Sequence, residues 1–289
     1  MNTNKLLSEL AADQLDADGG LQWLQKKQGS LASDFKPRTF YLAFSACPRF
    51  IEKAPLQLDD SWRERMQAVY PNFGKITWAQ DELARVLLMT SLPVDQNRDI
   101  LEKLFETADY REQVALYKGL YFLENAPEFA ERAREGLRTN MVGVFDAIAL
   151  ENPFPAEYLS QDAWNQMALK AMFMSRPLYR IARIEDRKNQ DLARMCIDYA
   201  HERWSAHRSV SPELWRFVSG YVDEAIFADI QKTVTEGSEL EQQAAAKALA
   251  ESDLPAGKNW LQEQGITARQ LPDWDTIGQH YEVEQAATA

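Results

Sequence analysis

The sequence predicts an all-α protein of stacked helix pairs, arranged as an α-solenoid of the HEAT- or armadillo-like kind. Apolar residues recur at helical spacing along almost the whole chain of 289 residues. Glycine is sparse, with 12 residues, which argues against the many tight turns of a sandwich or barrel. The periodic segments span roughly 10 to 18 residues and are joined by short links, a pattern typical of helical arrays.

The N-terminal half contains many residues that mark helix starts and stops. Acidic and hydroxyl side chains accept hydrogen bonds from the first N–H groups of a helix, whereas proline and glycine interrupt the helical pattern. The predicted boundaries are Gly19-Gly20, Pro48, Asp59 to Ser61, Pro71, Pro93 and Pro127.

The C-terminal half continues the helical pattern after a break. The segment ENPFPAEYLS contains two prolines and must interrupt the helices on either side of it. Helices are then expected over QDAWNQMALKAMFM, over 191–207, after Ser211-Pro212-Glu213, and from Asp223 and Ser238.

The composition is that of a globular protein with a sizeable core. Hydrophobic residues make up 45% and aromatic residues 11% of the chain, far from the disordered class. We expect one helical-array domain over 1–281, in which 1–60 form a looser N-terminal cap, followed by a disordered tail over 282–289.

The net charge of −12 restricts the partners of the protein. Phosphate backbones repel an acidic chain, so we expect no nucleic-acid partner and a poor fit to anionic membranes. No stretch of about 18 apolar residues occurs, so no direct membrane insertion is expected. The first residues lack a signal-peptide pattern, and Cys47 and Cys196 stand among apolar residues as expected for free thiols. We therefore expect a soluble protein of the reducing cytoplasm.

Three predicted helices are apolar on every side except for one charge each. The charges are Lys118 in VALYKGLYFL, Asp146 in MVGVFDAIAL and Lys170 in MALKAMFM. Such helices belong in the middle of a helical pack, where a lone charge must be paired or reach water. Asp146 is expected to pair with Lys118, Lys170 or a nearby arginine. Alternatively, each lysine extends along its stem to solvent.

The helix DLARMCIDYAHERWSAHR carries the most suggestive polar pattern. At about 100° per residue, Asp198, His201 and Glu202 share one face of it. This spacing suits an acid/base pair or part of a metal site on one helix. It equally suits a solvated polar face with pairing along the helix.

The proline-rich turn from Asn152 to Tyr158 is a second candidate. Its two prolines produce either a stiff link between helices or a preorganised pocket edge with polar groups from Asn152, Glu157 and Tyr158. Arg138 at a helix end fits a favourable interaction with the helix dipole, which weakens its case as a ligand contact. Trp164, Trp204 and Trp215 stand near these segments and fit either core positions or pocket walls.

Common catalytic and cofactor motifs are missing from the sequence. Neither GxGxxG nor GxxxxGK[ST] occurs, so no ordinary nucleotide cradle is indicated, and GxSxG is absent too. With 3 histidines and 2 scattered cysteines, a structural zinc site is not expected. We expect no cofactor and no metal.

Four patterns between residues 152 and 216 resemble the EboA family. They are the Asn-Pro-x-Pro-Ala-Glu-Tyr turn, the Trp-Asn-x-Met helix, the Asp-Tyr-Ala-His-Glu-Arg-Trp helix and the Ser-Pro-Glu-Leu-Trp-Arg helix start, in this order. The resemblance implies a soluble metabolite-traffic protein. Genes of this kind resemble those found beside a prenyltransferase-like membrane protein and several hydrolase- or isomerase-like enzymes. Such gene clusters are linked to exporting a precursor of a secondary metabolite.

Two functions follow from these observations. In the first, the protein binds a small organic metabolite, a protein of the same gene cluster, or both, in a helical groove without catalysis. The groove would be lined by Arg138, Asn152, Glu157, Tyr158, Trp164, Asn165, Trp204 and Trp215, together with Asp198, His201 and Glu202. In the second, it is an enzyme in which His201 is the general base, oriented by Asp198 or Glu202; a metal-dependent variant would need a further ligand from another helix.

Overall fold

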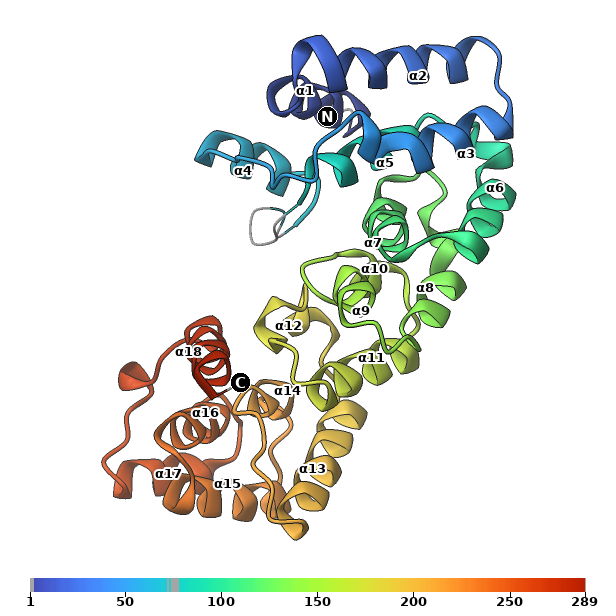
Figure 1. The fold of residues 1–289 in the computed structure, drawn as a ribbon. Coiled ribbons are helices and arrows are strands. Elements are labelled where there is room, and N and C mark those ends of the chain that lie inside the picture. Colours follow the sequence, from blue (N-terminus) through green and yellow to red (C-terminus); the bar gives the residue numbers. More distant parts are fainter. Residues whose placement is uncertain (1–2, 72, 74–77, 289) are drawn as a thin grey trace. The chain divides into compact units, whose positions relative to one another are not determined.

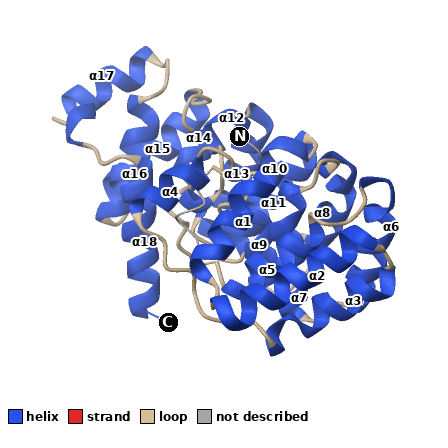
Figure 2. Ribbon diagram, turned by 90° about the horizontal axis from the view of Figure 1, so that it is seen from above, coloured by secondary structure: helices blue, strands red, loops and turns tan. Residues whose placement is uncertain are grey.

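The computed structural model describes residues 3–71, 73 and 78–288, and in this part of the chain the fold is all-α (Figures 1 and 2). The described residues contain eighteen α-helices, a few short 3-10 and π segments, and no strand. The prediction of the fold class is thus confirmed at this level. None of the described helices is long and apolar enough to cross a membrane.

The chain forms two compact units, Met1–Ser160 and Gln161–Ala289. Two compact units are compatible with one continuous array, so the solenoid arrangement and the single domain over 1–281 stay predictions.

The first unit is built around α5, which is buried on every side. Helices α1, α2, α3 and α7 all pack against α5, and α7 in turn packs against α9. Gly119 at the end of α7 permits this approach, because a Cβ there would lie 2.6 Å from Met89 Sδ of α5. The helices of this unit are α1 (Thr3–Gln14), α2 (Gln22–Ser33), α3 (Pro37–Ala46), α4 (Asp60–Gln67), α5 (Gln80–Met89), α6 (Val94–Thr107), α7 (Tyr110–Gly119), α8 (Ala130–Gly136), α9 (Val142–Ala149) and α10 (Phe154–Tyr158).

Buried charges join α5 to α7 inside the first unit. Asp81 is fully buried and pairs with Arg85 at 2.7 Å and with Arg111 at 2.6 Å. Glu82 pairs with Lys118 at 2.7 Å, with both side chains largely buried. Lys118 therefore uses a partner on α5, which the lone-charge pattern did not identify. Each of these carboxylates is compensated within the low-dielectric interior, as a buried charge requires.

The second unit pairs α13 with α14 and α15 with α16. The start of α14 differs from expectation: Ser211 and Pro212 precede the helix, which begins at Leu214. Glu213 explains the shift, because its carboxylate accepts hydrogen bonds from the N–H groups of Leu178 and Tyr179. The helices are α11 (Gln161–Phe173), α12 (Ile184–Arg187), α13 (Gln190–Ser205), α14 (Leu214–Val218), α15 (Glu224–Glu236), α16 (Glu239–Ala250), α17 (Pro255–Glu263) and α18 (Trp274–Thr288).

Helix α18 continues over the residues that the sequence predicts as a disordered tail from 282 onward. Most residues of its last turns are Glu, Gln and Ala, which have high helix propensity. Glu282 also holds this helix in place, since its carboxylate accepts a hydrogen bond from the Tyr179 hydroxyl at 2.6 Å and pairs with Arg180 at 3.3 Å.

Candidate functional site

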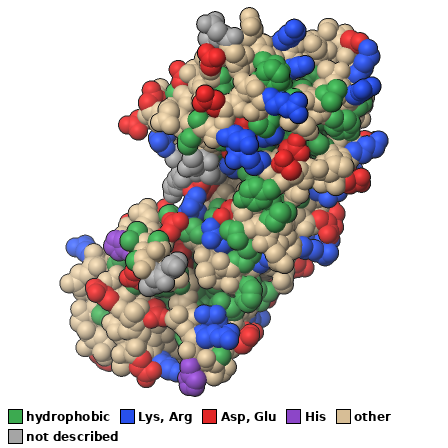
Figure 3. Space-filling model, in the orientation of Figure 1, with side chains coloured by type: hydrophobic (Ala, Val, Ile, Leu, Met, Phe, Trp, Pro, Cys, Tyr) green, Lys and Arg blue, Asp and Glu red, His purple; other side chains and the backbone are tan. Residues whose placement is uncertain are grey.

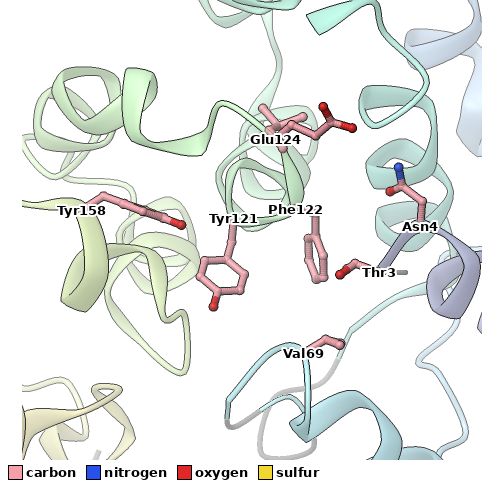
Figure 4. Close-up of a pocket in the computed structure, with 8 residues that line it drawn as sticks. Thr3, Asn4, Val69, Tyr121, Phe122, Glu124 and Tyr158 are labelled. Atoms are coloured by element: carbon pink, nitrogen blue, oxygen red, sulfur yellow. The ribbon is translucent and has the colours of Figure 1, made fainter. Parts of the chain in front are cut away.

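A cavity of about 430 Å³ lies within the first unit and is lined by residues from four separate stretches of the chain. Figure 4 shows the rings of Tyr121 and Phe122 pointing into the space between Tyr158 on one side and Thr3 with Asn4 on the other. Its size falls within the range of small-molecule sites, which is roughly 300–1,000 Å³. The lining residues are Thr3, Asn4, Val69, Tyr121, Phe122, Leu123, Glu124 and Tyr158.

Short elements place these side chains around the cavity. Thr3 and Asn4 stand in the first turn of α1, and Tyr158 ends α10. Tyr121 and Phe122 belong to a 3-10 turn, Leu120–Phe122, that follows α7 directly. A 3-10 turn is tighter than an α-helix, so the rings of Tyr121 and Phe122 point in directions that a continued α7 would not give them.

The aromatic wall continues into the core behind Phe122. The Tyr70 ring stacks on Phe122 with centroids 5.1 Å apart, and Trp78 meets Phe122 edge-on at 6.0 Å. Tyr121 contacts Tyr70 at 5.2 Å and Tyr158 at 6.3 Å. Aromatic pairs at these separations are favourable, so the wall is a connected set of rings.

Three polar atoms in this region are buried without a hydrogen-bond partner among the described residues. They are Asn4 Oδ1, the Tyr70 hydroxyl and Trp78 Nε1. Of these, Asn4 belongs to the cavity lining. Burial raises the pKa of the Tyr70 phenol well above its usual value, which keeps the hydroxyl a neutral hydrogen-bond donor. An unpaired buried polar atom costs about 1–3 kcal/mol, so a bound molecule that pairs with Asn4 would recover part of this energy.

Two of the sequence-predicted ligand residues belong to this region. Tyr158 lines the cavity, and Glu157 accepts a hydrogen bond from the Tyr121 hydroxyl at 3.0 Å. Burial and the neighbouring Glu157 carboxylate raise the pKa of Tyr158, so its phenol is neutral. The proline-rich turn thus contributes one edge of the cavity.

Asn152 and Arg138, the other predicted residues of the first unit, are occupied by local contacts. Asn152 is 2% exposed, and its amide donates to the carbonyls of Ala147 at 2.9 Å and Tyr117 at 3.4 Å. Its side-chain oxygen accepts from the Phe154 N–H at 2.9 Å. Asn152 therefore fixes the turn after α9. Arg138 is exposed and pairs with Glu135 at 3.3 Å, just after the end of α8.

Four of the predicted residues of the second unit do not share one surface. Trp164 and Trp215 are 0% and 2% exposed and belong to the core. Asn165 is buried and exchanges amide hydrogen bonds with Asn189 at 2.8 and 3.3 Å. Trp204 is half-buried on α13, where its ring lies 5.7 Å from that of His201.

The predicted polar face of α13 is present and exposed to solvent. Asp198, His201 and Glu202 are all exposed. The partner of His201 is on another helix: its Nε2 lies 2.8 Å from Asp229 Oδ2 of α15. The sequence placed the orienting carboxylate on the same helix and did not identify Asp229, which follows 28 residues later.

No group of three or more His, Cys, Asp and Glu side chains is positioned to hold a metal ion in the described part of the chain. Asp198, His201 and Glu202 thus do not form such a group among the described residues. Both cysteines are free and buried, and burial raises the pKa of the Cys47 thiol to about 12, which keeps that thiol protonated and unreactive.

Sequence reasoning missed most of the cavity. Tyr121 and Phe122 stand in an apolar run that predicts a buried helix, and nothing in such a run separates a pocket wall from a core position. Thr3, Asn4 and Val69 have no local pattern that marks them. The only sequence signal for the cavity wall lies at Tyr121 and Phe122. These consecutive aromatic residues follow Gly119 at a helix end, where side chains can point away from the helix.

Comparisons with known proteins identify the family. No curated protein and no solved structure shows significant similarity to the chain. The sequence pattern of the family described as "Metabolite traffic protein EboA" matches residues 3–219. This match includes the whole described cavity lining and extends far beyond the 152–216 segment on which the resemblance was first based. The chain therefore belongs to the EboA family of metabolite traffic proteins.

Proposed function

We propose that this protein carries a small, partly apolar organic metabolite in the cavity of its first unit, without chemically changing it. The observation that supports this most directly is a cavity with both aromatic and polar walls, one of whose lining residues, Asn4, has a buried side-chain oxygen without a hydrogen-bond partner among the described residues. Aromatic walls supply apolar contact area, and a few polar atoms orient the ligand, as in many small-molecule sites. The traffic role of the family supports a carrier over a catalyst.

The dimensions of the cavity set the size of the cargo. A volume of about 430 Å³ lies near the lower end of the range of small-molecule sites, roughly 300–1,000 Å³, so the cargo is a small molecule. The cargo would offer an apolar face to Tyr121, Phe122 and Tyr158 and a hydrogen-bond donor to Asn4. We further propose that it is the precursor of a secondary metabolite, received from or delivered to proteins of the same gene cluster in the cytoplasm.

The test is recovery of a bound compound from a metabolite extract. Purified protein is incubated with an extract of its source cells, separated from free compounds, and analysed by native mass spectrometry and by liquid chromatography of the released ligand. Val69→Trp fills the cavity and should reduce the recovered ligand at least about tenfold, the equivalent of 1.4 kcal/mol. Val142→Trp is the matched control, because Val142 is 46% exposed on α9 and outside the lining.

Two results would contradict the carrier proposal. One is the absence of any retained compound in the parent protein. The other is equal retention by the Val69→Trp variant and the parent. Asn4→Leu keeps the side-chain volume and removes the acceptor, so weaker retention by this variant would identify the polar contact of the ligand.

The contact between His201 and Asp229 favours one alternative, in which the protein is an enzyme. A carboxylate 2.8 Å from one imidazole nitrogen would orient the ring and leave the other nitrogen as general base, with Asp198 or Glu202 close by on the same helix. The same extract decides between the two functions. An enzyme should convert a compound into a new species, and His201→Asn should abolish the conversion.

We also propose that the helices form the α-solenoid that the sequence predicts. Consecutive helices pack on one another at several places, including α15 on α16 and α16 on α17. This nearest-neighbour packing supports a stacked array. Small-angle X-ray scattering tests it, because one rigid solenoid over 1–281 gives a single set of distances within the particle, whereas two globules that move independently give a broad distribution of distances.

A further inference from the structure

One segment of this acidic protein is locally basic. Residues 21–53 contain six Lys or Arg and only two acidic residues, whereas the whole chain has a net charge of −12. The segment folds into α2, α3 and the 3-10 turn Cys47–Arg49 that follows α3. Surface charges act mainly within a Debye length of about 8 Å at physiological salt, so the local excess of four positive charges in 21–53 (six minus two) matters here more than the net charge of the whole chain.

Most of these cations are free of ion pairs. Lys36 pairs with Asp34 at 2.5 Å. The others take part in no ion pair among the described residues: Lys26, Lys27, Arg38, Arg49 and Lys53. Unpaired and solvated, they are available to an anionic partner at no cost of breaking an internal contact.

The same segment exposes large apolar side chains. Leu42 and Phe50 are 61% and 51% exposed, the highest values among large hydrophobic residues in the described part of the first unit. Trp23 of α2 stacks on Phe50 with ring centroids 4.9 Å apart. The stack fixes two aromatic rings at the surface where α2 begins and α3 ends.

Charged and apolar side chains alternate along α3 and the 3-10 turn that follows it. Arg38, Leu42 and Arg49 recur at i, i+4 and i+11, which places them in one stripe along α3 and its 3-10 extension. Figure 3 shows Lys and Arg side chains gathered with apolar ones over the region of α2 and α3. We define the α2–α3 face by Trp23 and Lys27, which lie one turn apart on α2, by the stripe of Arg38, Leu42 and Arg49, and by Phe50, which stacks on Trp23.

We propose that the α2–α3 face docks this protein on an anionic phospholipid surface. Isolated apolar groups between long cationic side chains are typical of interfacial membrane binding, where aromatic and aliphatic groups enter the headgroup region and Lys or Arg contact phosphates. Lysine is depleted at protein interfaces, whereas the 21–53 segment that forms this face contains four lysines. The docking is peripheral and adds to the carrier role by bringing the cargo site to a membrane.

Vesicle sedimentation tests the proposal on the full chain. One set of vesicles is phosphatidylcholine alone, and the other contains roughly one third phosphatidylglycerol, at low and high salt. The parent protein should sediment with the anionic vesicles at low salt, remain in solution with the neutral ones, and be released by high salt. Arg38→Glu with Arg49→Glu should weaken partitioning at least about 25-fold, at roughly fivefold per cation.

Matched controls separate the face from the net charge. Arg98→Glu with Lys103→Glu changes the net charge equally on exposed sites of α6 and should bind like the parent. Leu42→Ser with Phe50→Ser should weaken binding but keep its dependence on salt. Circular dichroism establishes that each variant is folded.

Several outcomes would overturn the proposal. They are the absence of parent binding to anionic vesicles at low salt, and equal losses for the α6 and the α3 charge reversals. Retention of the parent on immobilised polyglutamate without binding to vesicles would also overturn it, because the face would then serve an acidic protein.

Discussion

The buried ion pair between Lys118 and Glu82 gives the sharpest test of how the core holds the cavity wall. Their contact is 2.7 Å, with side chains only 7% and 10% exposed. Lys118 Nζ also lies 5.2 Å above the ring of Trp78, which meets Phe122 of the cavity edge-on. Lys118→Met preserves most of the stem volume and removes the charge. The Glu82 carboxylate is then buried with the Ala79 N–H as its remaining described donor, at 3.1 Å.

The expected loss is about 3–5 kcal/mol in the free energy of unfolding of the first unit, the usual cost of leaving one buried charge unpaired. Replacing both partners, as in Glu82→Gln with Lys118→Met, should recover most of this loss. A neutral glutamine can still accept the Ala79 N–H, and buried pairs are often replaced by neutral groups without net cost.

Hydrogen exchange at increasing urea is the appropriate assay, because it reports the opening of α5 and α7 separately from the second unit. Lys5→Met serves as the control, since the Lys5–Glu9 pair is exposed, with contact at 3.9 Å, and should change stability by less than about 1 kcal/mol. A cost below about 1 kcal/mol for Lys118→Met, or a double variant as unstable as the single one, would contradict this prediction.

Two further predictions concern pH and the backbone. Burial raises the pKa of the Glu213 carboxyl from 4.5 to about 7, so the folded state binds the carboxyl proton more tightly than the unfolded state does. The free energy of unfolding should therefore fall by roughly 3 kcal/mol as pH rises from 4.5 to 7. Urea unfolding of Glu213→Gln should lose this slope, and a parent without the slope would refute the assignment. Gly29→Ala in the interior of α2 should raise the free energy of unfolding by about 0.5–1 kcal/mol, because alanine favours a helix more than glycine does. Gly220→Ala should lower it by about 1 kcal/mol, because Gly220 has φ +89°. Thermal unfolding measures both changes, and changes of the same sign would contradict this prediction.

The helical fold could be predicted because its signals are local. Asp59, Asp223 and Ser238 each accept a hydrogen bond from an N–H in the first turn of the helix they precede, as their side chains indicate in the sequence. The start of α14 could not be read in the same way. There a tertiary contact of Glu213 with another segment outweighs the local Ser-Pro pattern.

The candidate site was only partly predictable because its residues meet through tertiary packing. Tyr158, which lines the cavity, stands in the rigid proline-rich turn, a local feature that the sequence does reveal. Asn4, Val69 and Tyr121 are separated by more than fifty residues at each step. Their convergence depends on how α1, the segment after α4 and the turn after α7 pack together, and periodicity within one helix contains no such information.

The family match ends inside the second compact unit, which continues to the end of the chain. This difference helps to decide which part of the chain carries the function of the family. The match ends at Ser219, yet side chains beyond it complete contacts of matched residues. Arg216 pairs with Asp275 at 2.9 Å, and the Ser219 hydroxyl donates to Glu251 at 2.6 Å. The orienting carboxylate of His201 also comes from beyond the match. The cavity, in contrast, has all its described lining within the matched residues. A property shared by the family therefore belongs more naturally to the cavity than to the pairing of His201, which depends on a segment that the family pattern does not include.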